Sequence, residues 1–258
     1  AQVGESGPIR LKAEGLELEN ESPFGVGLRG LDLEARGGEI LGVAGVAGNG
    51  QDALIQALLG ERRVTAGRLT LDAKDVTYAS PSARRQAGLC GTPEERLGHA
   101  AVPTFSLSEN TLLSAREREA LAPSQLISRD KAKDFAAKVI ETFGVKTPST
   151  ETPASSLSGG NLQKFVVGRE VLQRPEVYVV CQPTWGVDAH AAAMIRKALV
   201  DMAEAGTAVV VISQDLDELL EISTRIGALY LGQLSATIDA SEASAQKLGE
   251  MMLGAEVA

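Results

Sequence analysis

The chain has 258 residues, of which 44% are hydrophobic, and it carries a formal net charge of −9 at pH 7. This length allows one large buried core or two smaller ones. The negative charge argues against nucleic acid and anionic membranes as partners, because proteins that bind them usually present a basic surface. No apolar run approaches the roughly 20 residues needed to cross a bilayer, and the N-terminus lacks the apolar core of a signal peptide. We therefore expect a cytoplasmic protein.

The ends of the chain and its few reactive residues add little chemistry. The first residue is not Met and "AQVGESGP" has linker composition, so we assign 1–8 to a linker, 9–258 to one domain, and expect a piece of a longer polypeptide. Cys90 and Cys181 lie beside apolar runs, which predicts buried free thiols. His99 and His190 have no Cys or His neighbours at ligand spacing, so we expect no metal site there.

The first part of the chain predicts strands and one helix that follows a glycine-rich turn. The expected strands are "IRLKAEGLEL", "GLRGLDLEA", "EILGVA", "GRLTLDAKDVTY" and "GLCGTP". After Gly50, "QDALIQALLG" places its apolar residues on one helical face and ends in Gly60, a typical helix stop. A second helix is expected over 81–87.

The composition then changes to charged, amphipathic helices, which predict an inserted helical subdomain over about 106–154. Its charged runs, "REREA" and "RDKAKD", indicate a solvated helix face, with a docking role for part of the block as the alternative. Beyond Leu157, helices alternate with the apolar strands "VYVVC", "AVVVIS" and "RIGALYL". Apolar strands separated by helices are typical of a parallel sheet covered on both faces, so the fold class is α/β.

Two short motifs suggest phosphate binding at helix starts. "GVAGNGQD" carries Gly45, Gly48 and Gly50 before the first helix, a pattern that alone also fits a plain strand-to-helix turn. "LSGGNLQK" places Ser158 and two glycines before another helix. Backbone N–H groups at a helix N-terminus attract anions, and two such motifs in one chain favour a nucleotide.

These motifs resemble those of the ATP-binding domains of ABC transporters. "GVAGNGQD" stands at the Walker A position, "GTPEER" at the Q-loop, "LSGGNLQK" at the signature, "VYVVCQPTWGVD" at Walker B and the D-loop, and "VVVISQD" at the switch. The sequences of these motifs are similar to those in the second ATP-binding domain of fused nucleoside and simple-sugar importer ATPases. The resemblance implies an α/β P-loop NTPase fold of the ABC type, a mostly parallel sheet flanked by helices, with an antiparallel β edge and a helical subdomain.

Several positions depart from the family pattern. The Walker A Lys is Gln51, and the hydroxyl residue that ligates Mg²⁺ is Asp52. The Walker B Asp is Cys181, the catalytic Glu is Gln182 and the switch His is Gln214. Because Gln cannot accept a proton from water, losing that base typically costs about 10² to 10⁴ in rate. The resemblance therefore implies a weak or non-hydrolytic site on this domain, without metal ligands of its own.

The resemblance also implies a full set of site residues. Glu94, or next Glu95, replaces the Q-loop Gln, and Phe24 lies near the adenine-stacking position, although a core or rim role is as plausible. The implied nucleotide-binding residues are Phe24, Gly45, Gly48, Asn49, Gly50, Gln51, Asp52, Glu94, Ser158, Gly159, Gly160 and Asn161. Gln182, Gln214 and Asp188 occupy the catalytic and D-loop positions. Trp185, beside the D-loop, fits either a domain interface or ordinary surface packing.

The intact signature implies a division of labour between two facing domains. In the family, each ATP lies between the Walker A of one domain and the signature of the other, so Ser158 to Asn161 would serve the partner's ATP and its Mg²⁺. Asp52 fits either a favourable first-turn position or a carboxylate that repels a terminal phosphate.

The resemblance leads to one expected function with several alternatives. We expect the energy-coupling ATP-binding domain of a bacterial importer, for nucleosides or alternatively simple sugars, at the inner face of the membrane and weak or inactive in isolation. Its partners would be a second ATP-binding domain fused upstream, membrane permeases and an extracellular substrate-binding protein, with no nucleic acid. The other classes are a soluble ABC ATPase, disfavoured by the short helical insertion, and a non-catalytic regulatory domain.

Overall fold

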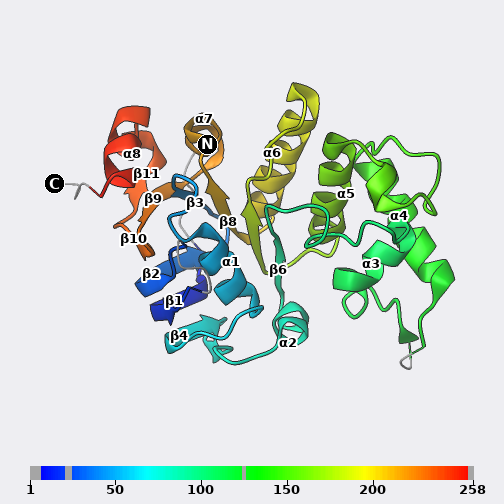
Figure 1. Ribbon diagram of the computed structural model, residues 1–258, viewed down its shortest axis with the longest axis horizontal. Helices are drawn as coiled ribbons and strands as arrows, with labels where there is room; N and C mark the ends of the chain where they lie inside the picture. The colour runs from blue at the N-terminus through cyan, green and yellow to red at the C-terminus, as the bar shows by residue number, and fades with distance from the viewer. Residues whose placement is uncertain (1–6, 21–24, 124–125, 255–258) are drawn as a thin grey trace. The chain divides into compact units, whose positions relative to one another are not determined.

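The computed structural model describes residues 7–20, 25–123 and 126–254 (Figure 1). The expected linker therefore falls mostly outside the described residues. The chain separates into two compact units, which are described one at a time. The first unit comprises Ala1–Gly91, Glu176–Gln182 and Leu199–Ala258, and the second comprises Thr92–Pro175 and Pro183–Ala198.

An antiparallel sheet in the first unit has the strand order β2-β1-β4-β5. Its strands are β1 (Ile9–Leu18), β2 (Leu28–Arg36), β4 (Ala66–Leu71) and β5 (Lys74–Asp75). β1 is an interior strand and pairs antiparallel with both β2 and β4. The expected antiparallel edge is thus a sheet of its own, because its alternating strands bury one face and expose the other.

The second sheet has the order β10-β9-β3-β8-β7-β6, with β11 paired to β9. Its strands are β3 (Ile40–Ala44), β6 (Leu89–Thr92), β7 (Val177–Cys181), β8 (Ala208–Ser213), β9 (Arg225–Tyr230), β10 (Gln233–Leu234) and β11 (Ile238–Asp239). β3 pairs parallel with β8 and β9, and β7 pairs parallel with β8. Every residue of β3, β7 and β8 is buried, which confirms the predicted parallel sheet.

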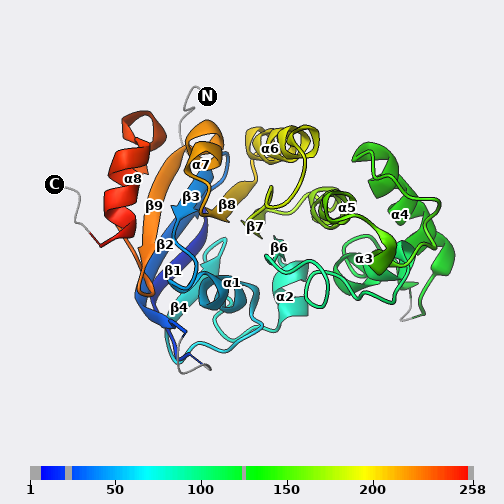
Figure 2. The ribbon, with the colours of Figure 1, turned by 45° about the horizontal axis from the view of Figure 1, so that its top comes forward.

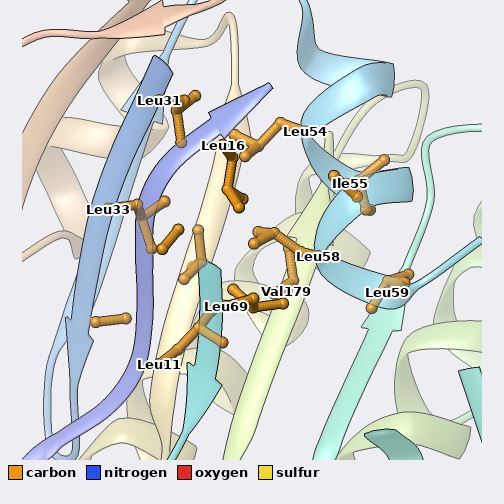
Figure 3. Packing of buried hydrophobic residues seen from close by; sticks show 14 of the residues in the cluster. Leu11, Leu16, Leu31, Leu33, Leu54, Ile55, Leu58, Leu59, Leu69 and Val179 are labelled. Atoms are coloured by element: carbon orange, nitrogen blue, oxygen red, sulfur yellow. The ribbon is translucent and has the colours of Figure 1, made fainter. Parts of the chain in front are cut away.

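The core of the first unit lies where α1 (Gln51–Leu59) meets these strands. Figure 3 shows Leu54 and Leu58 of α1 directed toward leucines of the antiparallel sheet and toward Val179 of β7. Burying each such side chain contributes about 1.5 to 3 kcal/mol. As predicted, Gly60 ends α1, and its φ of 79° is one that glycine adopts without steric cost.

The first unit contains further helices. They are α2 (Pro81–Gln86), α7 (Leu216–Ile222), the 3₁₀ helix Ala240–Glu242 and α8 (Ala245–Met252). α8 packs along β9 and against α7, as Figure 2 shows. α6 (Ala189–Glu204) begins in the second unit and ends in the first. No helix in the described ranges is long and apolar enough to cross a membrane.

The second unit is built on α3 (Leu107–Ala115), α4 (Arg129–Thr142) and α5 (Gly159–Val171), which contact one another. A 3₁₀ helix, Ala154–Ser156, precedes α5. Ser106 and Glu109 form a capping box that fixes the start of α3. α3 ends at Ala115, before the run "REREA", and the chain then turns through Ala120 at φ 50°. The charged run "RDKAKD" is exposed except for Ala132, as predicted for a solvated face.

Candidate functional site

The glycine motif forms the loop between β3 and α1 in the first unit. β3 ends at Ala44 and α1 begins at Gln51, which confirms the predicted order of strand, glycine turn and helix. Gly48 and Gly50 have φ values of 86° and 108°, which side-chain-bearing residues rarely adopt. Gly50 is the N-cap of α1 and gives it no side-chain cap. The glycines thus give this loop a backbone conformation that other residues would rarely adopt.

The side chain of Gln51 folds back into this loop. It is 8% exposed. Its Nε2 donates to the carbonyl oxygen of Val46 over 2.6 Å, and its Oε1 accepts from the backbone N–H of Asn49 over 3.0 Å. A Cβ on Gly45 would lie 2.9 Å from the same Nε2. One backbone N–H that could face a phosphate is therefore already bonded within the loop.

Asn49 and Asp52 complete the loop. Asn49 donates from Nδ2 to Val46 over 3.0 Å and accepts the N–H of Leu231 over 3.0 Å, which ties the loop to the end of β9. Asp52 lies in the first turn of α1, as predicted, and it is exposed. Its negative charge is placed where the helix dipole favours an anion.

The Walker B and switch positions lie side by side in the first unit, at the ends of β7 and β8. Cys181 is the last residue of β7 and is 1% exposed. Gln182 follows at φ 49° and donates its N–H to Ile212 over 2.8 Å. Its Oε1 accepts from the N–H of Gln214 over 3.4 Å and lies 3.3 Å from the hydroxyl of Ser213. The structure thus brings Gln182 and Gln214 together just beyond the carboxyl ends of β7 and β8.

These residues do not fit a magnesium ion. Mg²⁺ prefers oxygen ligands in octahedral geometry, whereas Cys181 offers a buried thiol and Gln182 a neutral amide already used in hydrogen bonds. In the described part of the chain, no group of three or more His, Cys, Asp or Glu side chains could hold a metal ion. Both cysteines are buried and neither is part of a disulfide, as predicted.

The signature forms the start of α5 in the second unit. Ser158 is the N-cap, and its Oγ accepts from the N–H and Nδ2 of Asn161 over 3.4 and 3.0 Å. Asn161 in turn accepts the N–H of Lys146 over 2.9 Å. Gly159 and Gly160 are the first two helical residues, whose N–H groups have no intrahelical acceptor. Ser158 and Gly159 are exposed, so this helix start faces solvent.

The D-loop position also lies in the second unit. Oδ1 of Asp188 accepts the N–H of Ala191 over 2.9 Å, which caps the start of α6. This backbone hydrogen bond is the main cause that lowers the pKa of Asp188, with smaller contributions from His190 and Lys164. The neighbouring Trp185 is 59% exposed.

Sequence reasoning missed a pair of residues beside the signature. Arg96 donates from Nε to Oε1 of Gln163 over 2.8 Å, and Nε2 of Gln163 donates to the carbonyl of Pro183 over 2.8 Å. Arg96 follows Glu94 and Glu95 in "GTPEER", and its basic side chain in an acidic run was the available signal. Glu94 is exposed in the same unit, and its charge acts on Arg96. Phe24 lies outside the described residues.

Comparison with known proteins shows the family to which the chain belongs. A family profile described as "ABC transporter" matches residues 28–185. The chain therefore belongs to the ABC transporter family of ATPases, whose members in general bind ATP with Mg²⁺.

The chain is also similar to individual ATP-binding proteins of importers. The chain is 34% identical over 227 residues to the guanosine import ATP-binding protein NupO of Bacillus subtilis (strain 168), covering 88% of this chain and 44% of that protein. It is 35% identical over 251 residues to the ribose import ATP-binding protein RbsA of Chromobacterium violaceum, covering 97% of this chain and 48% of that protein. The chain spans about half the length of the curated relatives it matches.

A solved structure confirms the fold. A crystal structure of a nucleotide-free ATP-binding cassette from an ABC transporter superposes with a TM-score of 0.73 at 19% identity, covering 95% of this chain and 96% of that one. The α/β ABC-type fold, with a mostly parallel sheet and an antiparallel sheet, is thus as predicted.

Proposed function

We propose that this chain is an ATP-binding domain of an ABC importer whose own nucleotide site is degenerate. In this proposal the chain supplies its signature to the ATP held by a second ATP-binding domain. The observation that carries the proposal is the contrast between the two helix starts. Gln51 hydrogen-bonds across its own loop, whereas Ser158 and Gly159 are exposed at the start of α5.

The chemistry of the first site argues against hydrolysis there. Gln51 replaces a cation with a neutral amide, which lowers phosphate affinity by about 1.5 to 3 kcal/mol, the strength of a hydrogen bond to a charged group. Asp52 adds a negative charge at the same helix start. Gln182 can orient a water molecule but cannot accept its proton. The proposed first site therefore binds ATP weakly and turns over slowly or not at all.

The signature at the start of α5, in contrast, is suited to binding a phosphate. The N–H groups of Gly159 and Gly160 and the hydroxyl of Ser158 offer donors at the positive end of the α5 dipole. No acidic residue lies in the first turn of α5 to oppose an anion. These donors would hold the terminal phosphate of the partner's ATP, and the Mg²⁺ bound with that ATP would neutralise phosphate charge.

The proposed cargo is a nucleoside, with a simple sugar as the alternative. The names of the relatives support both, because NupO is a guanosine import protein and RbsA a ribose import protein. The proposed partners are the second ATP-binding domain, membrane permeases and an extracellular substrate-binding protein, which places the chain at the inner face of the membrane.

The test is ATP turnover by this chain assembled with its partner ATP-binding domain and permeases. Ser158→Arg blocks the signature and is expected to lower turnover by about 10² to 10³, the usual effect of losing a donor to a reacting anion. Ser155→Arg, at an exposed serine three residues earlier, is the matched control and keeps full turnover. Gln51→Ala is expected to stay within about twofold of the unaltered complex, because this loop is not where hydrolysis occurs.

Two results would contradict the proposal. Turnover that survives Ser158→Arg would show that the signature is not used. Steady ATP hydrolysis by this chain alone, abolished by Gln51→Ala, would show that its own loop is a working site.

A further inference from the structure

The guanidinium of Arg96 lies beside the start of α5 and is held there by a hydrogen bond from its Nε. Nε donates to Gln163 over 2.8 Å, and Gln163 is 1% exposed and donates to Pro183 over 2.8 Å. Because Gln163 is fixed at both ends of its amide, it sets the orientation of Arg96. In the described part of the chain, Arg96 donates its side-chain hydrogen bond from Nε, which leaves Nη1 and Nη2 as donors.

Gly159 leaves room for Nη1, whereas Gly186 lies at ordinary contact distance from Nη2. A Cβ on Gly159 would lie 2.9 Å from Nη1, and a Cβ on Gly186 would lie 3.5 Å from Nη2. Nine in ten real Cβ contacts are longer than about 3.4 Å, so a side chain on Gly159 would displace the guanidinium. The cation therefore lies against Gly159, the first helical residue of α5.

The electrostatics of this arrangement is unfavourable without an anion. The α5 dipole places partial positive charge at its N-terminus, where a cation is repelled. Burial lowers the pKa of Arg96, and the charge of Glu94 opposes that effect. An arginine side chain nevertheless stays charged at neutral pH. A negatively charged group seated between the guanidinium and the helix start would turn this repulsion into two attractions.

We propose that Arg96 is a further phosphate-binding residue of the composite site and contacts the terminal phosphate of the ATP that the partner domain holds. This inference rests on the proposed function, since it requires the signature to face that ATP. The planar guanidinium matches phosphate oxygens with paired N–H donors, which an ammonium does not. Arg96 thereby supplies a cation to the phosphate from the signature side. It makes the association of the two ATP-binding domains depend on that phosphate.

The experiment measures nucleotide-dependent association of this chain with its partner ATP-binding domain, in which hydrolysis has been blocked by replacing the catalytic Glu with Gln. Sedimentation gives the Kd in ATP and in ADP. Arg96→Gln removes the charge and is expected to weaken association in ATP by about tenfold or more, as loss of one charge-assisted contact predicts. Association in ADP is expected to stay unchanged, because ADP lacks the terminal phosphate.

Three further variants keep the result interpretable. Arg116→Gln, at an exposed arginine of the same unit paired with Glu117, is the matched control and leaves both Kd values unchanged. Arg96→Lys keeps the charge without the paired donors and is expected to give an intermediate Kd in ATP. Ser158→Arg tests the underlying function and abolishes association in ATP.

The outcomes separate the two proposals. If Ser158→Arg weakens association and Arg96→Gln does not, the role of Arg96 is wrong while the proposed function stands. If Arg96→Gln weakens association equally in ATP and ADP, Arg96 only positions Gln163, and the inference is overturned. If Ser158→Arg has no effect, the proposed function and this inference fall together.

Discussion

The starts of α1 and α5 differ in what their side chains do. Both follow glycine-bearing motifs, and both have N–H groups that no intrahelical acceptor satisfies. At α1 the residue after the last glycine, Gln51, bonds to its own loop. At α5 the cap residue Ser158 bonds to Asn161 and leaves Gly159 exposed. Glycines set the backbone geometry, whereas one neighbouring side chain decides whether a helix start is available to a ligand.

A large effect on ATP affinity is expected from reversing the difference at α1. The double variant Gln51→Lys with Asp52→Thr replaces an internally bonded amide and a carboxylate with a cation and a hydroxyl. ATP affinity of the chain, measured by calorimetric titration with Mg²⁺, is expected to rise by about 10- to 100-fold, which corresponds to one hydrogen bond to a charged group. ATP binding no tighter than that of the unaltered chain would mean that Gln51 and Asp52 do not limit this site.

A smaller effect is expected on stability when Gln51 is truncated. Gln51→Ala removes two hydrogen bonds and leaves the Val46 carbonyl with the Asn49 side chain as its remaining donor in the loop. The free energy of unfolding in urea is expected to fall by about 1 to 3 kcal/mol, at about 0.5 to 1.5 kcal/mol for each of the two hydrogen bonds. Gln214→Ala, at a half-buried glutamine, is the control and should change it less. An unchanged free energy of unfolding for Gln51→Ala would argue against these two hydrogen bonds.

The smallest effect concerns pH and the second unit. The pKa of Asp188 is lowered from its ordinary 3.8, first by the N–H of Ala191. Because the folded pKa lies below the unfolded one, its contribution is present above 3.8 and is lost as pH falls through the folded value. Asp188→Asn should therefore be slightly less stable than the unaltered chain at neutral pH and equal to it in acid. A difference that persists in strong acid would assign the effect to something other than this charge.

The sequence allowed the elements and the family to be predicted, because those depend on local patterns. The apolar runs of β3, β7 and β8, the stop at Gly60 and the first-turn position of Asp52 all follow from neighbours along the chain. The end of α3 at Ala115 was misjudged, since "REREA" has good helix formers but few apolar residues to pack on the unit.

The contacts that decide the chemistry could not be predicted in the same way. The bond from Gln51 to Val46 depends on the three-dimensional course of the glycine turn, which residue types alone leave open. The bond from Arg96 to Gln163 joins residues 67 positions apart, so no local pattern encodes it. Residue types therefore indicated which positions had changed from the family pattern, and the structure showed what their side chains contact instead.

The burial of both cysteines has a practical consequence for chemical labelling. Cys90 and Cys181 are 0% and 1% exposed, and thiol reagents react with accessible thiolates. A single cysteine introduced at exposed Ser155, close to the signature but outside it, would be modified selectively. A fluorophore attached there would report the approach of a second domain without removal of either native thiol from the core.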